Sequence, residues 1–180
     1  MPSQRIMLIR HAEKPKGAWP GPGLDENGSK DKDSLVIRGW QRAGALAAFF
    51  RAPQAPLATP ARIYASDPLK VDDTGSKSKR PLQTITPLAA VLPLEVITRY
   101  VKGQEQALSQ ELAVTTGDTL VCWQHESIPP IAGALLGDDR PLSWPDDRFD
   151  LVWVLQRAEQ TDAWTFTEVR QGLLVGDLPA

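Results

Sequence analysis

The stretch Arg5-Ile6-Met7-Leu8-Ile9-Arg10-His11-Ala12-Glu13-Lys14 decides how the rest of this 180-residue chain is interpreted. Its apolar run is too short for a helix of ordinary length. It suits a strand that is buried on both faces, as in a parallel sheet. Arg10 and His11 would then stand just past the carboxyl end of that strand. Ligands bind at this edge in open α/β sheets, so the stretch predicts a site there.

Length and composition indicate one soluble globular domain over residues 1–180. Hydrophobic residues make up 42% of the chain and charged residues 23%, which excludes disorder over its whole length. The net charge of -2 gives no sign of a nucleic-acid or membrane-surface binder, and no run of about 18 apolar residues predicts a membrane span. The single Cys122 cannot form an internal disulfide, so we expect a cytoplasmic protein.

Alternating patterns predict the remaining elements. The segment from Ala12 to Asp33 is rich in proline and glycine and predicts a long loop, whose lysines at 14, 16, 30 and 32 face either an anionic ligand or solvent. Ser34 is expected to cap a helix from Leu35 to about Arg51. Further strands are expected at 62–66, 94–100, 119–123, 151–155 and 164–169, further helices at 80–91, 104–113 and 128–136, and a second loop at 67–79.

This order predicts a three-layer α/β/α sandwich with a largely parallel central sheet. The last two strands are expected to form an antiparallel hairpin at one edge, around a turn at 159–162.

The two histidines of the chain, His11 and His125, each follow a predicted strand directly. An arginine precedes the first, and Glu126 follows the second. Two titratable side chains in equivalent positions at one sheet edge indicate catalysis more strongly than either would alone.

The run from Leu8 to Pro15 resembles the signature of the histidine phosphatase superfamily, the phosphoglycerate-mutase-like clan, in which Arg-His-Gly follows the first strand. Further matches come in the same order: Arg38-Gly39-x-x-Arg42-Ala43, Tyr64-Ala65-Ser66, Arg80-x-x-Gln83-Thr84 and His125. The resemblance covers about residues 5 to 136. There are two departures: Ala12 replaces the glycine, and thirteen residues separate Ser66 from Arg80 where the family usually has three or four. Residues 67–79 would therefore be an insertion beside the pocket.

The resemblance implies that His11 is a nucleophile that forms a phosphohistidine, while Arg10, Arg80 and His125 bind the phosphoryl group. Elementary chemistry agrees, because guanidinium groups bind phosphate bidentately and a neutral imidazole can attack phosphorus. With that charge supplied by side chains, no metal and no cofactor is expected.

Two carboxylates are candidates for the proton donor to the leaving group. Glu126 is preferred, because it follows His125 as the acidic residue does in the acid-phosphatase branch of the clan. Glu13 is the alternative, and its other interpretation is an ion pair with Lys14, Lys16 or an arginine.

These residues predict a metal-independent phosphatase that acts on a phosphomonoester or phosphohistidine of a small molecule or a phosphoprotein. Two alternatives stay open: a mutase that returns the phosphate to another hydroxyl, and a non-catalytic module that binds a phosphorylated ligand. A zinc site from His11, His125 and Cys122 is disfavoured, because strand spacing points Cys122 and His125 to opposite faces. Substrate identity and oligomeric state do not follow from the sequence.

Overall fold

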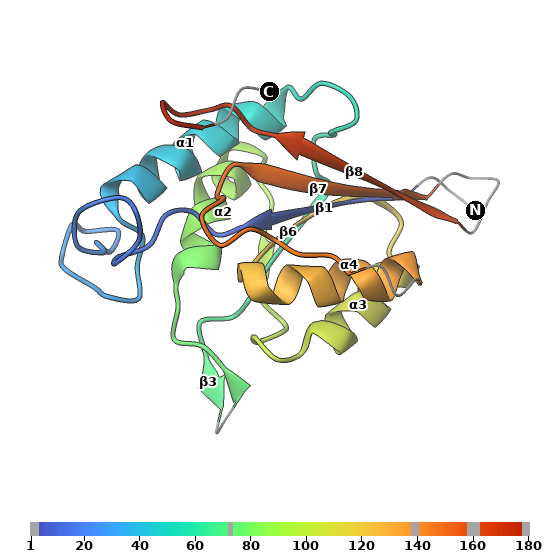
Figure 1. Cartoon of the computed structure of the whole chain (residues 1–180), viewed down its shortest axis with the longest axis horizontal. Helices are drawn as coiled ribbons and strands as arrows, with labels where there is room; N and C mark the ends of the chain where they lie inside the picture. Colours follow the sequence, from blue (N-terminus) through green and yellow to red (C-terminus); the bar gives the residue numbers. More distant parts are fainter. Residues whose placement is uncertain (1–3, 72–73, 138–140, 158–162, 178–180) are drawn as a thin grey trace.

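The computed structural model describes residues 4–71, 74–137, 141–157 and 163–177, and its centre is a six-stranded sheet (Figure 1). The strand order is β5-β2-β6-β1-β7-β8. The first four strands in this order are mutually parallel. Strand β7 pairs antiparallel with β1, and β8 pairs antiparallel with β7. The strands span Gln4–Arg10 (β1), Arg62–Ala65 (β2), Val96–Ile97 (β5), Gly117–Trp123 (β6), Leu151–Arg157 (β7) and Trp164–Arg170 (β8).

Four helices cover the two faces of this sheet, which gives the predicted three-layer sandwich (Figure 1). Alternate residues of β1 enter different cores: Ile6 and Leu8 pack with residues of α3 and α4, whereas Met7 and Ile9 pack with residues of α1 and α2. The strand is therefore buried on both faces, as its apolar run predicts. The helices span Ile37–Arg51 (α1), Arg80–Val91 (α2), Glu105–Val114 (α3) and Ile128–Leu136 (α4).

The parallel strands end level with one another, which brings the segments that follow them together. Arg10 pairs in register with Trp123, and Ala65 pairs with Cys122. The predicted meeting of polar residues at the carboxyl edge is thus a consequence of the register.

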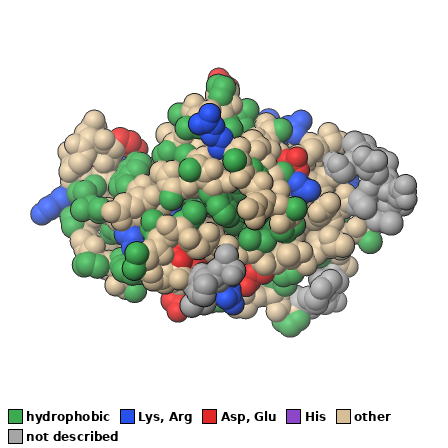
Figure 2. All heavy atoms as spheres, turned by 90° about the horizontal axis from the view of Figure 1, so that it is seen from above, with side chains coloured by type: hydrophobic (Ala, Val, Ile, Leu, Met, Phe, Trp, Pro, Cys, Tyr) green, Lys and Arg blue, Asp and Glu red, His purple; other side chains and the backbone are tan. Residues whose placement is uncertain are grey.

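The last two strands form the predicted antiparallel hairpin at the edge of the sheet, with Leu151 opposite Arg170. The predicted turn at 159–162 lies outside the described residues. Figure 2 views the molecule from above, and both acidic and basic side chains appear on that face without either sign covering it. Among the described residues, no helix has the length and apolar character needed to cross a membrane.

The start of the first helix was predicted wrongly. Helix α1 begins at Ile37, with Val36 as its N-cap, rather than at Leu35 after a Ser34 cap. The Ser34 hydroxyl instead donates to the Asp31 carboxylate over 2.8 Å and accepts from the Gln83 amide over 2.9 Å. These tertiary partners take the hydroxyl that would otherwise have capped the helix.

Two further segments differ from the expectation. The strand predicted at 94–100 is only Val96–Ile97 in β5. The insertion at 67–79 is not a plain loop, because Lys70–Val71 (β3) and Thr74–Gly75 (β4) pair as a small antiparallel hairpin (Figure 1). The insertion ends at Arg80, which begins α2.

Candidate active site

His11 is buried at the carboxyl end of β1, with 3% of its surface exposed. Its backbone N–H donates to the Trp123 carbonyl over 3.0 Å, which extends the β1–β6 pairing by one residue. Nδ1 of the ring lies 2.8 Å from the Ala12 carbonyl, an acceptor only, so Nδ1 carries the proton and Nε2 keeps its lone pair. Burial holds the pKa of His11 well below its usual value. The Ala12 hydrogen bond raises it, while Arg80, Arg10 and Lys14 lower it.

The first turn of α2 holds the backbone that follows His11. Thr84 Oγ1 accepts from the Ala12 N–H over 2.8 Å and donates to the Arg80 carbonyl over 2.7 Å. Gln83 fixes the far end of the long loop, since its Oε1 accepts from the Leu35 N–H over 3.0 Å. The Arg80-x-x-Gln83-Thr84 motif therefore positions both ends of the loop that starts at the nucleophile.

Arg10 is held by residues 146–149, a segment in which the sequence shows no motif. Its Nη1 donates to the carbonyls of Asp146 and Arg148, at 2.5 and 3.2 Å, and its guanidinium carbon lies 3.8 Å from the centre of the Phe149 ring. The same ring lies 6.3 Å from the His11 ring, centre to centre. Burial lowers the pKa of Arg10 to about 10, although the negative charges of Glu126 and Asp146 act to raise it.

Arg80 and Lys14 bring further positive charge to the same place. Arg80 Nη1 donates to the Lys32 carbonyl over 3.2 Å. Burial lowers the pKa of the Arg80 guanidinium and of the Lys14 amine, and Lys14 is lowered further by Arg10 and Arg80. Of the four loop lysines considered from the sequence, Lys14 is therefore the one whose charge interacts with both predicted phosphate-binding arginines.

His125 and Glu126 begin the short 3-10 helix η1 (His125–Ser127) that follows β6. His125 Nε2 donates to Asp146 Oδ1 over 3.0 Å, and Nδ1 lies 2.9 Å from Glu126 Oε2 without hydrogen-bond geometry. The other carboxylate oxygen of Glu126 accepts from Lys102 Nζ over 2.5 Å. Burial and Arg10 lower the pKa of His125, and the two neighbouring carboxylates raise it by less.

Glu13 lies outside this group, in a buried ion-pair network. Its carboxylate is 1% exposed and accepts from Arg42 over 2.8 Å and from Arg38 over 3.1 Å. Asp177 closes the network, since Oδ1 lies 2.7 Å from Arg42 Nη2. The Arg38-Gly39-x-x-Arg42 motif thus anchors Glu13, and the arginine ion pair considered for Glu13 from the sequence is present.

Several solved structures share this arrangement of strands and helices. The protein histidine phosphatase SixA, solved with tungstate, aligns over 93% of this chain and 97% of its own with a TM-score of 0.61 and 13% identity. A phosphoserine phosphatase mutant from Entamoeba histolytica, solved with phosphoserine, aligns over 91% of this chain and 95% of its own with a TM-score of 0.54 and 13% identity.

A third structure, a mycobacterial hydrolase, aligns over 92% of this chain and 90% of its own with a TM-score of 0.53 and 13% identity. The chain has the fold of these three structures. The resemblance predicted from the sequence is confirmed at the level of fold. No protein-family model and no curated protein matches the sequence.

Three residues of this candidate site were missed from the sequence: Lys102, Asp146 and Phe149. Each lies in a connection between elements, and each reaches the site through a contact with a residue far away in the chain. Asp146 stands in a stretch rich in proline and aspartate, where nothing distinguishes it from its neighbour Asp147.

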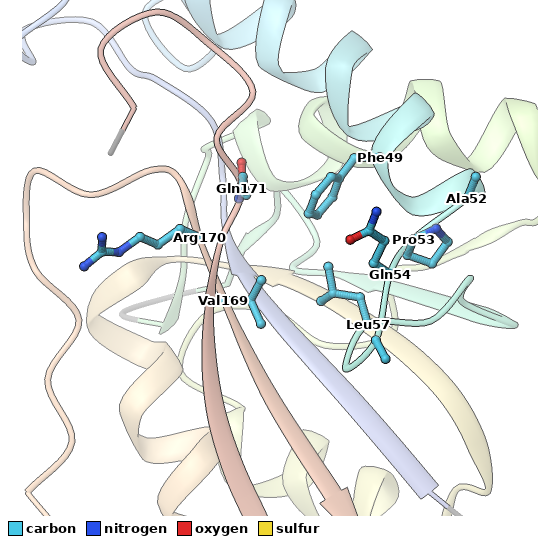
Figure 3. A pocket seen from close by; sticks show the side chains of 9 residues that line it. Phe49, Ala52, Pro53, Gln54, Leu57, Val169, Arg170 and Gln171 are labelled. Carbon is cyan, nitrogen blue, oxygen red and sulfur yellow. The ribbon is translucent and has the colours of Figure 1, made fainter. Parts of the chain in front are cut away.

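A separate cavity of about 310 Å³ lies between the end of α1 and the end of β8 (Figure 3). Phe49, Leu57 and Val169 turn toward one another around it, whereas the Arg170 side chain points away. None of the predicted site residues lines it.

Proposed function

We propose that this protein is a metal-independent phosphatase that hydrolyses a phosphomonoester or phosphohistidine through a covalent intermediate on His11. The observation that carries the proposal is the state of His11. It is buried, its proton is held on Nδ1 by the Ala12 carbonyl, and its low pKa leaves Nε2 unprotonated at neutral pH. An imidazole in this state is a nucleophile that needs no separate base.

The polar atoms around His11 support phosphate as the ligand. Arg10 Nε and Arg80 Nε are buried and have no hydrogen-bond partner among the described residues. Buried polar groups are usually paired, and two guanidinium edges match the oxygens of a phosphoryl group. Charge on the equatorial oxygens would be balanced by Arg10, Arg80 and Lys14, whose electrostatic effects converge on His11.

In the proposed reaction, His11 Nε2 forms a bond to phosphorus while the bond between phosphorus and the leaving oxygen breaks. The electron pair goes to that oxygen, which receives a proton from a carboxylic acid. Water then attacks the phosphorus of the phosphohistidine, and the bond between phosphorus and Nε2 breaks with its electron pair returning to Nε2. The proton of the water passes to the carboxylate, so phosphate is released and both the neutral imidazole and the carboxylic acid are restored. We assign the proton donor to Glu126, because Glu13 is held by two arginines in a buried network.

The assay is hydrolysis of p-nitrophenyl phosphate between pH 4 and 8, with and without EDTA. We expect turnover that EDTA leaves unchanged. Phosphoserine and a phosphohistidine peptide are the next substrates to compare, because the structural neighbours include a phosphoserine phosphatase and a protein histidine phosphatase. Loss of turnover in EDTA would contradict the metal-independent mechanism.

The intermediate is tested by rapid acid-free quenching with a ³²P-labelled substrate. Wild-type protein should carry phosphate that is stable in base and labile in acid, and His11→Ala should carry none. His125→Ala is a matched control, because it removes the other histidine and keeps the nucleophile. Labelling that survives in His11→Ala would show that the nucleophile is another residue.

One observation favours the second candidate, a module that binds a phosphorylated ligand without turning it over. Burial raises the pKa of Glu126, but the hydrogen bond and charge of Lys102, a backbone hydrogen bond and the charge of His125 together lower it to about 2, so the assigned donor is ionised at neutral pH. Such a module would bind phosphate by calorimetry, with affinity lost in Arg80→Met, and would show no labelling of His11.

A further inference from the structure

Glu126, the assigned proton donor, forms an ion pair with Lys102 beside His125 in η1. Glu126 is about half exposed and Lys102 about one third exposed, so both side chains reach solvent. Their 2.5 Å contact keeps the assigned proton donor ionised. An enzyme that relies on Glu126 therefore needs a way to separate the pair when substrate binds.

The insertion at 67–79 holds the backbone of Lys102 in place. Its carbonyl accepts from the Gly75 N–H of the β3–β4 hairpin over 2.8 Å. Gly103, with a φ of 99°, turns the chain after it, and a Cβ added there would lie 3.3 Å from the Thr74 side chain. The insertion thus packs directly on the turn that carries Lys102.

A cavity of about 250 Å³ opens beside this turn, between the hairpin and η1. Thr74, Lys102, Glu105 and Ser127 contribute side chains to its lining. The Glu105 carboxylate is held in place by two neutral donors, since Oε1 accepts from the Trp123 indole over 2.9 Å and from the Gly103 N–H over 3.0 Å. Lys102 is the cationic side chain of this lining, and it has room to turn from Glu126 toward a group in the cavity.

We infer that Lys102 is a specificity-determining residue that binds an anionic group on the leaving alcohol of the substrate and, in doing so, frees Glu126 to act as the proton donor. This inference rests on the proposed phosphatase function and adds a substrate class to it: phosphomonoesters whose alcohol carries a carboxylate or a second phosphate. A neutral alcohol leaves Lys102 on Glu126, and the donor stays ionised.

The probes are three phosphate esters of similar size that differ in charge: 2-phosphoglycolate, ethyl phosphate and phosphoethanolamine. For wild-type protein, we expect kcat/KM to be about tenfold or more higher for phosphoglycolate than for ethyl phosphate, the value of a charge-assisted hydrogen bond. Phosphoethanolamine should be the poorest of the three. Equal kcat/KM values for phosphoglycolate and ethyl phosphate would overturn the inference. This comparison uses the wild-type protein alone.

Lys102→Gln should reduce that preference to about twofold or less. Lys102→Arg should keep it, because a cation remains. Lys70→Gln is the matched control, since it removes an exposed lysine from the same hairpin and should leave the preference unchanged. A preference that survives in Lys102→Gln would show that another group binds the anion and would overturn the inference.

The pH profile separates this role from a structural one. Besides Lys102, the charged groups that act on Glu126 are His125 beside it and, at longer range, Arg10, Lys14 and Arg80. Removing Lys102 leaves these in place, so the alkaline limb of kcat/KM for ethyl phosphate should move to higher pH in Lys102→Gln. If the alkaline limb of kcat/KM does not move in Lys102→Gln, then Lys102 does not control the protonation of Glu126. Failure of all three esters, with no labelling of His11, would overturn the phosphatase function itself.

Discussion

Thr84 Oγ1 accepts a hydrogen bond from the backbone N–H of Ala12 over 2.8 Å, across 72 residues of sequence. This contact holds the N–H side of Ala12, and the carbonyl of the same residue accepts from the His11 ring. The helix that begins at Arg80 therefore helps to orient His11, the proposed nucleophile, and also carries Arg80, a proposed phosphate-binding residue.

Thr84→Val should lower both stability and activity. The buried Ala12 N–H would lose its acceptor, at a cost of about 1–3 kcal/mol in the free energy of unfolding. The loosened His11 ring should lower kcat by about tenfold to a hundredfold, because small misplacements of reacting groups are costly. Thr84→Ser keeps the hydroxyl and should retain most of both. Urea titration and phosphatase kinetics test this, and a fully active Thr84→Val would refute the positioning role.

Two glycines of α1 give opposite expectations for the same substitution. A Cβ on Gly39 would lie 2.6 Å from the Glu13 carbonyl, so Gly39→Ala must push the helix from the loop that follows the nucleophile, at about 1–3 kcal/mol. Gly44 has no atom within 4 Å of the added Cβ, so Gly44→Ala should stabilise by about 0.5–1 kcal/mol through helix propensity. Thermal melts of the pair test the contrast, and equal shifts would contradict it.

The two candidate proton donors are separable, because Glu13 is buried in ion pairs and Glu126 is about half exposed. Glu126→Gln should lower kcat on 2-phosphoglycolate, an alkyl phosphate whose anionic alcohol frees this donor, by about 10² to 10⁴ and change stability by less than about 0.5 kcal/mol. Glu13→Gln leaves the buried Arg42 short of one partner, so it should cost up to about 3–5 kcal/mol.

The same two variants are compared on p-nitrophenyl phosphate, whose good leaving group needs little acid help. Glu126→Gln should be nearly normal on that ester, and any loss in Glu13→Gln should be the same on both esters. The opposite pattern, with Glu13→Gln selectively impaired on the alkyl phosphate, would move the donor to Glu13.

The sequence predicts the parts of this fold that depend on local pattern. The apolar run of β1, the Arg80–Val91 helix with Pro81 in its first turn, and the Ile128–Leu136 helix were all placed correctly. The sequence also predicts that the parallel strands end at one edge of the sheet. On that ground alone, His11 and His125 could be assigned to the same edge.

What the sequence does not predict depends on partners far away in the chain. Ser34 has the composition of an N-cap, but Gln83 and Asp31 take its hydroxyl. Asp146 reaches His125 from a connecting segment that has no periodic pattern. Nothing in the sequence distinguishes Lys102 from the other lysines, and its partner Glu126 lies 24 residues further along the chain. Such contacts have no local signature, because the residues on either side are compatible with an ordinary surface loop.

The buried state of His11 predicts how stability depends on pH. Its pKa in the folded protein lies well below 6.5, the ordinary value that the unfolded chain would show. Below pH 6.5 the unfolded state therefore binds a proton that the folded state does not, so stability falls as pH decreases. The slope from this one group approaches about 1.4 kcal/mol per pH unit until the folded pKa is reached.

Urea titrations at pH 7.5, 6.5 and 5.5 measure this slope. His11→Gln should flatten it, because glutamine does not titrate. His125→Gln should flatten it by less, because burial and Arg10 lower the pKa of His125 but Glu126 and Asp146 oppose them. These pH values lie above the ordinary titration range of aspartate and glutamate, so paired carboxylates such as Asp177 contribute only at lower pH. An unchanged slope in His11→Gln would mean that His11 titrates alike in the folded and unfolded states, which would contradict the lowered pKa on which its assignment as the nucleophile depends.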